Sequence, residues 1–237
     1  MEEKTQHNSR RAGFQLLAVV CAMWIALPGP ASLPAASAAA TSLPLDQFIN
    51  KVQQSYHDVR AIRADFTQTY DAAGVSRVES GTVVFARGGR MRWDYRSPEE
   101  KVFLSNKKEV LLYLPAQQQL NRSSVKQSED FRVPFRLLLS RIDLKKVFSR
   151  FEDANKQFQH AAEDRVVIAY PKHADKIGYK RVVMEFDPQM DIRRLLILYA
   201  NNTVMKFKFN HIDRNPGLAA AMFELTPPPG TQVINHQ

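Results

Sequence analysis

The feature that most constrains the fold is an alternation of apolar and polar residues that begins at Ile62 and recurs through most of the chain. Met91, Trp93 and Tyr95, for example, alternate with charged residues. A period of two places successive side chains on opposite faces of a strand, so this pattern predicts β-strands with one apolar face. The segments that we expect to form strands are 62–67, 77–86, 90–95, 101–104, 110–114, 117–123, 165–170, 179–186, 192–199 and 203–212.

The connections between these segments are short, which predicts antiparallel pairing. Four residues at 105–108, Asp187-Pro188 and Asn201-Asn202 leave no room for a crossover helix. A parallel connection needs a dozen or more residues, whereas a hairpin needs only a few. We therefore expect an antiparallel sheet of about ten strands, and sheets of that size tend to curl. The interior of a curled sheet holds either packed side chains or a ligand, and the alternation alone leaves both open.

Two segments have helical spacing instead. Apolar residues at 45–59 recur three and four positions apart, with Pro44 just before the first turn and Asp46 within it. The segment 134–148 interrupts the strands and fits one or two short helices that would lie against the sheet. No internal repeat and no low-complexity linker divides residues 41–237, so we expect a single domain there.

The first forty residues have the layout of a signal peptide. Two arginines precede an apolar run at 14–27, and small residues follow. The run is 14 residues long, whereas a membrane-spanning helix needs about 20. We expect residues 1–40 to be removed by cleavage between Ala38 and Thr41. A retained anchor is the alternative, and both general secretory and twin-arginine export stay open.

The sequence contains no motif that points to catalysis, and its many acidic residues cannot be sorted into catalytic pairs from spacing alone. The only cysteine, Cys21, lies in the apolar run, so residues 41–237 can form neither a disulfide nor a thiolate metal site. The chain has no G-x-S-x-G elbow, no phosphate-binding glycine loop and no histidine pair at metal-ligand spacing. We therefore expect no enzyme, no catalytic residue, no cofactor and no metal, with a hydrolase as the alternative of a different class. An exported domain without cysteine suits the bacterial periplasm.

The chain is basic, with 33 lysines and arginines against 24 aspartates and glutamates. This balance favours acidic partners, but it does not choose among nucleic acid, lipid headgroups and an acidic protein. Arg90 and Arg92 lie beside Trp93 and Tyr95, and such a mixture of cations and rings also occurs in nucleic-acid-binding surfaces. Because export argues against nucleic acid, we interpret this strand as having an inward aromatic face and a solvated arginine face.

Five short motifs occur in a fixed order along the chain. They are FTQ at 66–68, FARGGRMRWDY at 85–95, SPE at 97–99, LYLP at 112–115 and FELTPPPG at 223–230. Together they resemble the LolA family of periplasmic carriers of outer-membrane lipoproteins. The resemblance covers nearly all of residues 41–237. It implies a mainly β fold, namely a strongly curved, unclosed antiparallel β-barrel of about ten or eleven strands, with a short helical lid at 134–148.

The resemblance also implies a function and partners. A LolA-like protein binds the acyl chains of lipoproteins in an apolar interior and acts as a monomeric chaperone in the periplasm. It receives its cargo from an ATP-driven inner-membrane complex and passes it to an outer-membrane receptor. Sheltering the chains is worth about 0.8 kcal/mol per methylene group, so an enclosed interior removes a large penalty. A carrier of another lipid and a lipid-sensing regulatory domain are the alternatives.

The side chains that we expect to line this interior are chosen from the alternation and from the lid. They are Phe66, Phe85, Trp93, Tyr95, Leu112, Leu137, Leu138, Met184, Phe207 and Phe209. Each of them serves equally well as ordinary core. In LolA-like proteins an arginine before the tryptophan strand bonds to the lid and holds it shut. Arg87 occupies that place, although Gly88 follows it instead of proline. We expect Met91 near the mouth of the barrel, where a donor protein would contact it.

Overall fold

A computed structural model describes residues 43–125, 144–154 and 158–236. The chain separates into two compact units, Met1–Thr41 and Ser42–Gln237, and every described residue belongs to the second. The predicted signal peptide therefore lies outside the described residues, as do residues 134–143 of the predicted lid. Within the described ranges, no helix has the length and apolar character needed to cross a membrane.

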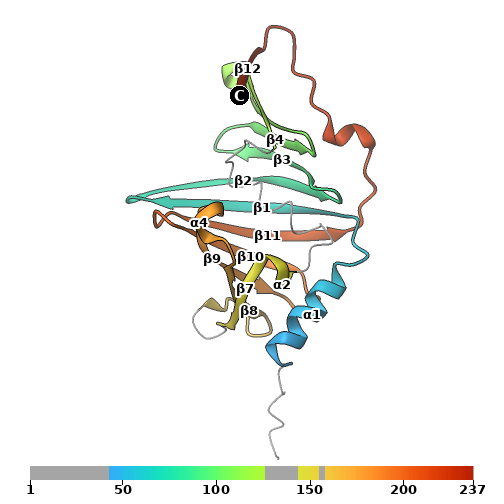
Figure 1. Ribbon diagram of the computed structural model, residues 1–237. Helices are drawn as coiled ribbons and strands as arrows, with labels where there is room; N and C mark the ends of the chain where they lie inside the picture. The colour runs from blue at the N-terminus through green and yellow to red at the C-terminus, as the bar shows by residue number, and fades with distance from the viewer. Residues whose placement is uncertain (1–42, 126–143, 155–157, 237) are drawn as a thin grey trace, which may run out of the picture. The chain divides into compact units, whose positions relative to one another are not determined.

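The second unit is built on one twelve-stranded sheet (Figure 1). Its strands are β1 (Ala61–Ala72), β2 (Val75–Ala86), β3 (Arg90–Ser97), β4 (Lys101–Asn106), β5 (Glu109–Leu114), β6 (Gln119–Ser124), β7 (Phe148–Asp153), β8 (Arg165–Pro171), β9 (Tyr179–Phe186), β10 (Ile192–Tyr199), β11 (Val204–Arg214) and β12 (Gln232–His236). The order across the sheet is β12-β6-β5-β4-β3-β2-β1-β11-β10-β9-β8-β7. Because the sheet ends at two different strands, β12 and β7, it is not closed.

All ten predicted strands are present, and the predicted antiparallel pairing is confirmed for every neighbouring pair except one. The exception is β12, which runs parallel to β6 and pairs Val233 with Leu120. The expected ten or eleven strands were too few, because β7 and β12 raise the number to twelve. Strand β12 has no buried residue, so its sequence carries no apolar face from which to predict it. Phe148 begins β7 and does not end the predicted helical segment.

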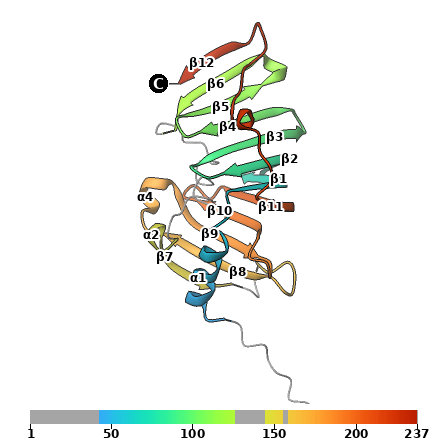
Figure 2. The same cartoon turned by 90° about the vertical axis from the view of Figure 1, so that its right-hand side faces the viewer.

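The helices of the described chain are few and short. They are α1 (Leu45–Ser55), α2 (Leu144–Val147) and α4 (Ala174–Ile177), with 3-10 turns at Pro115–Gln117 and Ala220–Phe223. Helix α1 follows the predicted spacing and buries Phe48, Ile49 and Val52. The Phe48 ring lies 5.6 Å from that of Phe186 on β9, so α1 covers the part of the sheet around β8 and β9 (Figure 2). The Gln53 side chain accepts a 2.9 Å hydrogen bond from the Leu144 amide, which joins α1 to α2.

The sheet is strongly curved. Trp93 on β3 and Phe207 on β11 are three strand positions apart, which is roughly 14 Å in a flat sheet. Their ring centroids nevertheless lie only 5.6 Å apart, because the curvature makes the inner side chains converge. The largest cluster of buried apolar residues occupies this inner face. The predicted fold class, a curved and unclosed β-barrel with few helices, is therefore confirmed.

The outer face is covered in part by the C-terminal segment. This segment runs back along the sheet from β11 toward β12 (Figure 1, red). Phe223 packs on Val84 and Ala86, and the Arg90 guanidinium lies over the Phe223 ring at 4.8 Å. Leu225 packs on a second outer cluster that contains Leu104. Both faces of β2 are therefore buried at Val83–Ala86, and both faces of β4 are buried at Phe103–Ser105.

Candidate functional site

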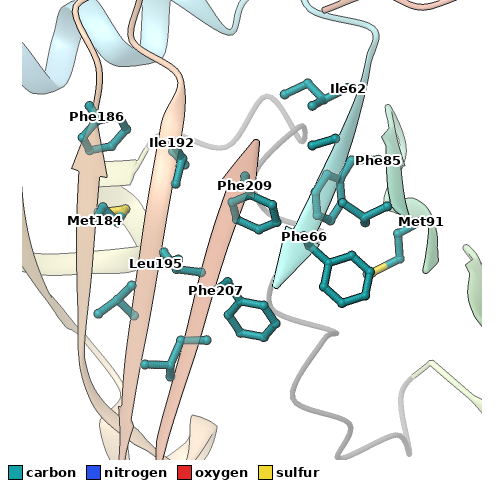
Figure 3. Packing of buried hydrophobic residues seen from close by; sticks show 14 of the residues in the cluster. Ile62, Phe66, Phe85, Met91, Met184, Phe186, Ile192, Leu195, Phe207 and Phe209 are labelled. Atoms are coloured by element: carbon teal, nitrogen blue, oxygen red, sulfur yellow. The ribbon is translucent and has the colours of Figure 1, made fainter. Parts of the chain in front are cut away.

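The inner face of the sheet carries a continuous group of aromatic rings. Phe66 meets Trp93 and Tyr95 edge to face, with ring centroids 4.8 and 4.9 Å apart. The Phe85 ring contacts Trp93 at 5.5 Å and Phe209 at 6.3 Å. Figure 3 shows Phe66 and Phe85 beside Phe207 and Phe209 of β11. Such edge-to-face pairs are a favourable arrangement for aromatic side chains. The sheet thus brings together rings from four strands, β1, β2, β3 and β11.

All of the predicted lining residues that fall in the described chain belong to this inner cluster or pack against it. Those buried within it are Phe66, Phe85, Trp93, Tyr95, Met184, Phe207 and Phe209. Leu112 is half-buried and packs on the cluster from β5. Leu137 and Leu138 lie outside the described residues. That these side chains contact a bound acyl chain stays a prediction.

The described side chains of the inner face pack closely on one another. A cavity of about 20 Å³ lies between the end of α1 and the inner face, with Tyr56, Phe85 and Phe209 among its walls. This volume suits one water molecule and is far too small for an acyl chain. An acyl chain therefore fits in this cavity only if its walls separate.

A buried polar network lies at the end of the inner face nearest the β1–β2 hairpin, and the sequence analysis missed it. The Tyr95 hydroxyl donates to Gln68 Oε1 at 2.9 Å, and Gln68 Nε2 donates to Glu79 Oε2 at 3.0 Å. Lys101 Nζ then donates to Glu79 Oε1 at 2.5 Å. Gln68 and Glu79 are buried on the face that Phe66 shares, so their alternating positions were the available signal. The network marks the limit of the apolar part of the inner face.

Arg87 binds the connection between α1 and β1. Its Nε donates to the Val59 carbonyl at 3.0 Å, its Nη2 donates to the His57 carbonyl, and its own amide donates to the Arg60 carbonyl at 2.9 Å. Guanidinium groups suit this task because they offer several donors in a fixed plane. Most of the predicted lid, residues 134–143, lies outside the described residues, so the predicted contact of Arg87 with the lid stays a prediction.

Met91 is fully buried within the inner cluster. Its sulfur lies 3.4 Å from Trp93 Nε1, which donates to it. A donor protein could not touch this side chain in the present conformation. The predicted contact of Met91 with a partner therefore requires the mouth of the barrel to open, and it stays a prediction.

Among the residues that the structure describes, no three histidine, cysteine, aspartate or glutamate side chains are placed to hold a metal ion. Burial raises the pKa of Tyr56 and of Asp191, which lie at the small cavity.

Comparison with known protein families assigns the chain to a family. The family model described as outer membrane lipoprotein carrier protein LolA matches residues 57–226, more than half of the chain. The chain belongs to the LolA family. Its family resemblance, expected from the five motifs, is thereby confirmed.

Individual members of the LolA family are similar over most of their length. An outer-membrane lipoprotein carrier protein of Dechloromonas aromatica (strain RCB) is 27% identical over 188 residues, which cover 78% of this chain and 86% of that protein. One of Nitrosomonas europaea is 25% identical over 206 residues, covering 85% and 92%. An uncharacterized conserved protein from Thermus thermophilus shares the fold, with a TM-score of 0.51 and 14% identity over 81% of this chain and 99% of that one.

Proposed function

We propose that this protein is a periplasmic carrier that shelters the acyl chains of lipoproteins against its inner face. The observation that carries the proposal is the continuous aromatic and aliphatic surface on the concave side of an unclosed sheet. Its membership of the LolA family and the names of its curated relatives support lipoproteins of the outer membrane as the cargo.

The proposal has a simple energetic basis. Exposing a lipoprotein acyl chain to water costs about 0.8 kcal/mol of free energy for each methylene group, so its transfer between membranes needs a dry apolar surface. The inner face offers that surface once the elements over it move. The aromatic side chains of the inner face already pack on one another, so an acyl chain that binds there replaces contacts between rings with contacts to itself. The net affinity is therefore smaller than the gross burial, which suits a carrier that must release its cargo.

The partners and the location form the finer part of the proposal. The cargo comes from an ATP-driven inner-membrane complex and goes to an outer-membrane receptor. The working unit is the domain 41–237, monomeric, after removal of residues 1–40. It acts without a cofactor and without chemistry of its own. Arg87 holds the lid at 134–148 shut. Met91 becomes accessible to the donor protein when the mouth of the barrel opens.

Mass spectrometry of the protein purified from its own periplasm tests the cargo. The expected result is a population that carries triacylated or diacylated lipoproteins. Free lipid in their place would favour a carrier of another lipid class, and a stable complex with a regulatory membrane protein would favour lipid sensing. Depletion of the protein should leave outer-membrane lipoproteins in the inner membrane. Normal sorting after depletion would refute the carrier role.

A further inference from the structure

Arg214, at the end of β11, ties the last turn of α1 to the turn between β9 and β10. Its Nε donates to Asp191 Oδ1 at 2.7 Å, and its Nη2 donates to the Gln189 carbonyl at 3.0 Å. On the other side its Nη1 donates to the Ser55 carbonyl in α1 at 3.3 Å. The guanidinium carbon also lies 5.0 Å from the centroid of the Tyr56 ring, a cation–π distance. One side chain on β11 thus contacts two other parts of the chain, the end of α1 and the turn between β9 and β10.

Tyr56, which Arg214 holds, forms one wall of the small cavity at the inner face. Its phenol oxygen accepts a 3.3 Å hydrogen bond from the Ile192 amide, which fixes the ring against β10. Other walls of the cavity are Ile62, Phe85 and Phe209. Two of these, Phe85 and Phe209, belong to the aromatic group of the inner face. The cavity is therefore a gap between that group and the end of α1.

We propose that acyl chains first reach the inner face at this cavity, and that Arg214 and Asp191 are positioning residues that hold Tyr56 over it. The inference rests on the proposed carrier function. Release of Arg214 from Ser55 and Asp191 frees the C-terminal end of α1. Movement of the Tyr56 ring then joins the cavity to the space around Phe85 and Phe209. This site is distinct from that of Arg87, which follows β2 and donates to the His57 and Val59 carbonyls.

The physical character of the pair suits a contact that opens. The Asp191 carboxylate is partly shielded from water, and this loss of hydration raises its pKa more than the nearby Arg214 lowers it. Asp187 raises the pKa further, and Arg193 lowers it. The attraction between Arg214 and Asp191 therefore does not fully compensate for the burial of the carboxylate. The Arg214–Asp191 pair therefore orients the side chains around Tyr56 but adds little to the stability of the closed arrangement.

Two measurements on Arg214→Gln test the inference. The first is hydrogen exchange of the amides at the C-terminal end of α1, such as that of the following residue Tyr56, which donates to the Val52 carbonyl at 3.3 Å. The second is the rate at which a fluorescent fatty acid is taken up, followed by stopped flow. Loss of a charge-assisted hydrogen bond should speed both by about tenfold, while exchange of the amides of β1 and β11 stays unchanged.

Arg194→Gln is a matched control. The Arg194 and Arg214 side chains are each 26% exposed, and each pairs with a carboxylate. The partner of Arg194 is Glu185, at 3.1 Å, and its other hydrogen bond goes to the Phe158 carbonyl, which is not in α1. The control should leave α1 exchange and fatty-acid uptake as in the wild type. Equal behaviour of the two variants in both measurements would overturn the inference.

The outcomes separate this inference from the proposed function. If the wild type binds no fatty acid and no lipoprotein, the carrier function fails, whatever Arg214 does. If the wild type binds and Arg214→Gln leaves α1 exchange unchanged, the positioning role alone fails. Should Arg214→Gln not fold, Arg214→Lys keeps the charge beside Asp191 but cannot reach all three partners. That variant should still accelerate α1 exchange and uptake, and wild-type values for both would contradict the proposal.

Discussion

Phe66 on β1 and Trp93 on β3 meet edge to face, with ring centroids 4.8 Å apart, although β2 lies between their strands. The residue of β2 that pairs with Phe66 is Gly81, which also pairs with Tyr95 on β3. Because glycine has no side chain, β2 places nothing between the rings at this level. The absence of one side chain thus permits the aromatic group on which the candidate site is built.

Removal of a ring from this group should destabilise the fold strongly. Phe66→Ala deletes a fully buried ring that contacts both Trp93 and Tyr95. A loss of about 3–5 kcal/mol in the free energy of unfolding is expected for such a cavity-forming change. Urea denaturation measures it. Val75→Ala, at a position with 63% exposure, serves as the control and should change the free energy by less than about 0.5 kcal/mol. A similar small change for Phe66→Ala would mean that the inner face is not packed as described.

Gly81→Ala should be damaging for a different reason. A Cβ atom at Gly81 would lie 2.0 Å from the Asp94 carbonyl oxygen, so the backbones of β2 and β3 would have to separate. We expect a loss of at least about 2 kcal/mol in the free energy of unfolding, measured by denaturant titration. Gly217→Ala is the matched control, since no atom lies within 4 Å of the Cβ added there. Tolerance of alanine at position 81 would contradict the close approach of the two strands.

The raised pKa of Asp191 gives the stability a pH dependence. Its ordinary pKa is 3.8, and burial raises it in the folded state. Below the ordinary value the carboxyl is protonated whether the chain is folded or not, so the shift has no effect there. Between the ordinary pKa and the raised pKa, the carboxyl is ionised in the unfolded chain but still protonated in the folded state. The free energy of unfolding therefore falls as the pH rises through this window. Asp191→Asn should remove this fall, whereas Asp58→Asn at an exposed site should not; denaturation at several pH values from about 4 to 7 measures both. An unchanged pH profile for Asp191→Asn would refute the assignment.

Arg87→Leu should leave the sheet intact and affect transfer. The substitution removes the side-chain bonds to the His57 and Val59 carbonyls, each worth about 0.5–1.5 kcal/mol net. The connection after α1 then loses an attachment, and we expect impaired uptake from the inner-membrane donor or impaired release to the receptor. A reconstituted transfer assay resolves the two steps. If uptake and release both proceed at wild-type rates, Arg87 does not hold the lid shut.

Much of the fold follows from the sequence because the strands follow a local rule. The alternation at Met91, Trp93 and Tyr95 predicts both the strand and the side chains that point inward, since a period of two fixes the face of each residue. The same rule correctly groups Phe207 with Phe209 on β11. Strand β12 breaks the rule because its pairing is decided by the exposed edge of β6 and not by an apolar face of its own.

The contacts that hold α1 in place could not be predicted in this way. Arg214 and Ser55 are 159 positions apart in the chain, and neither belongs to an apolar pattern. An arginine at the end of a strand is ordinarily a solvated residue. Only the curvature of the sheet, which brings the end of β11 to the end of α1, gives Arg214 its partners. Gln68 and Glu79 illustrate the intermediate case, because their positions were predictable but their mutual hydrogen bond was not.

Quenching of Trp93 fluorescence tests most directly whether acyl chains bind at the inner face. The domain 41–237 contains a single tryptophan, Trp93, which lies in the middle of the aromatic group and can be excited selectively. Titration with a brominated fatty acid should quench Trp93 in a saturable manner, because bromine quenches only at short range. A fluorescent fatty acid that binds the same protein while its brominated counterpart leaves Trp93 unquenched would show that acyl chains bind elsewhere, and would contradict the proposed function of the inner face.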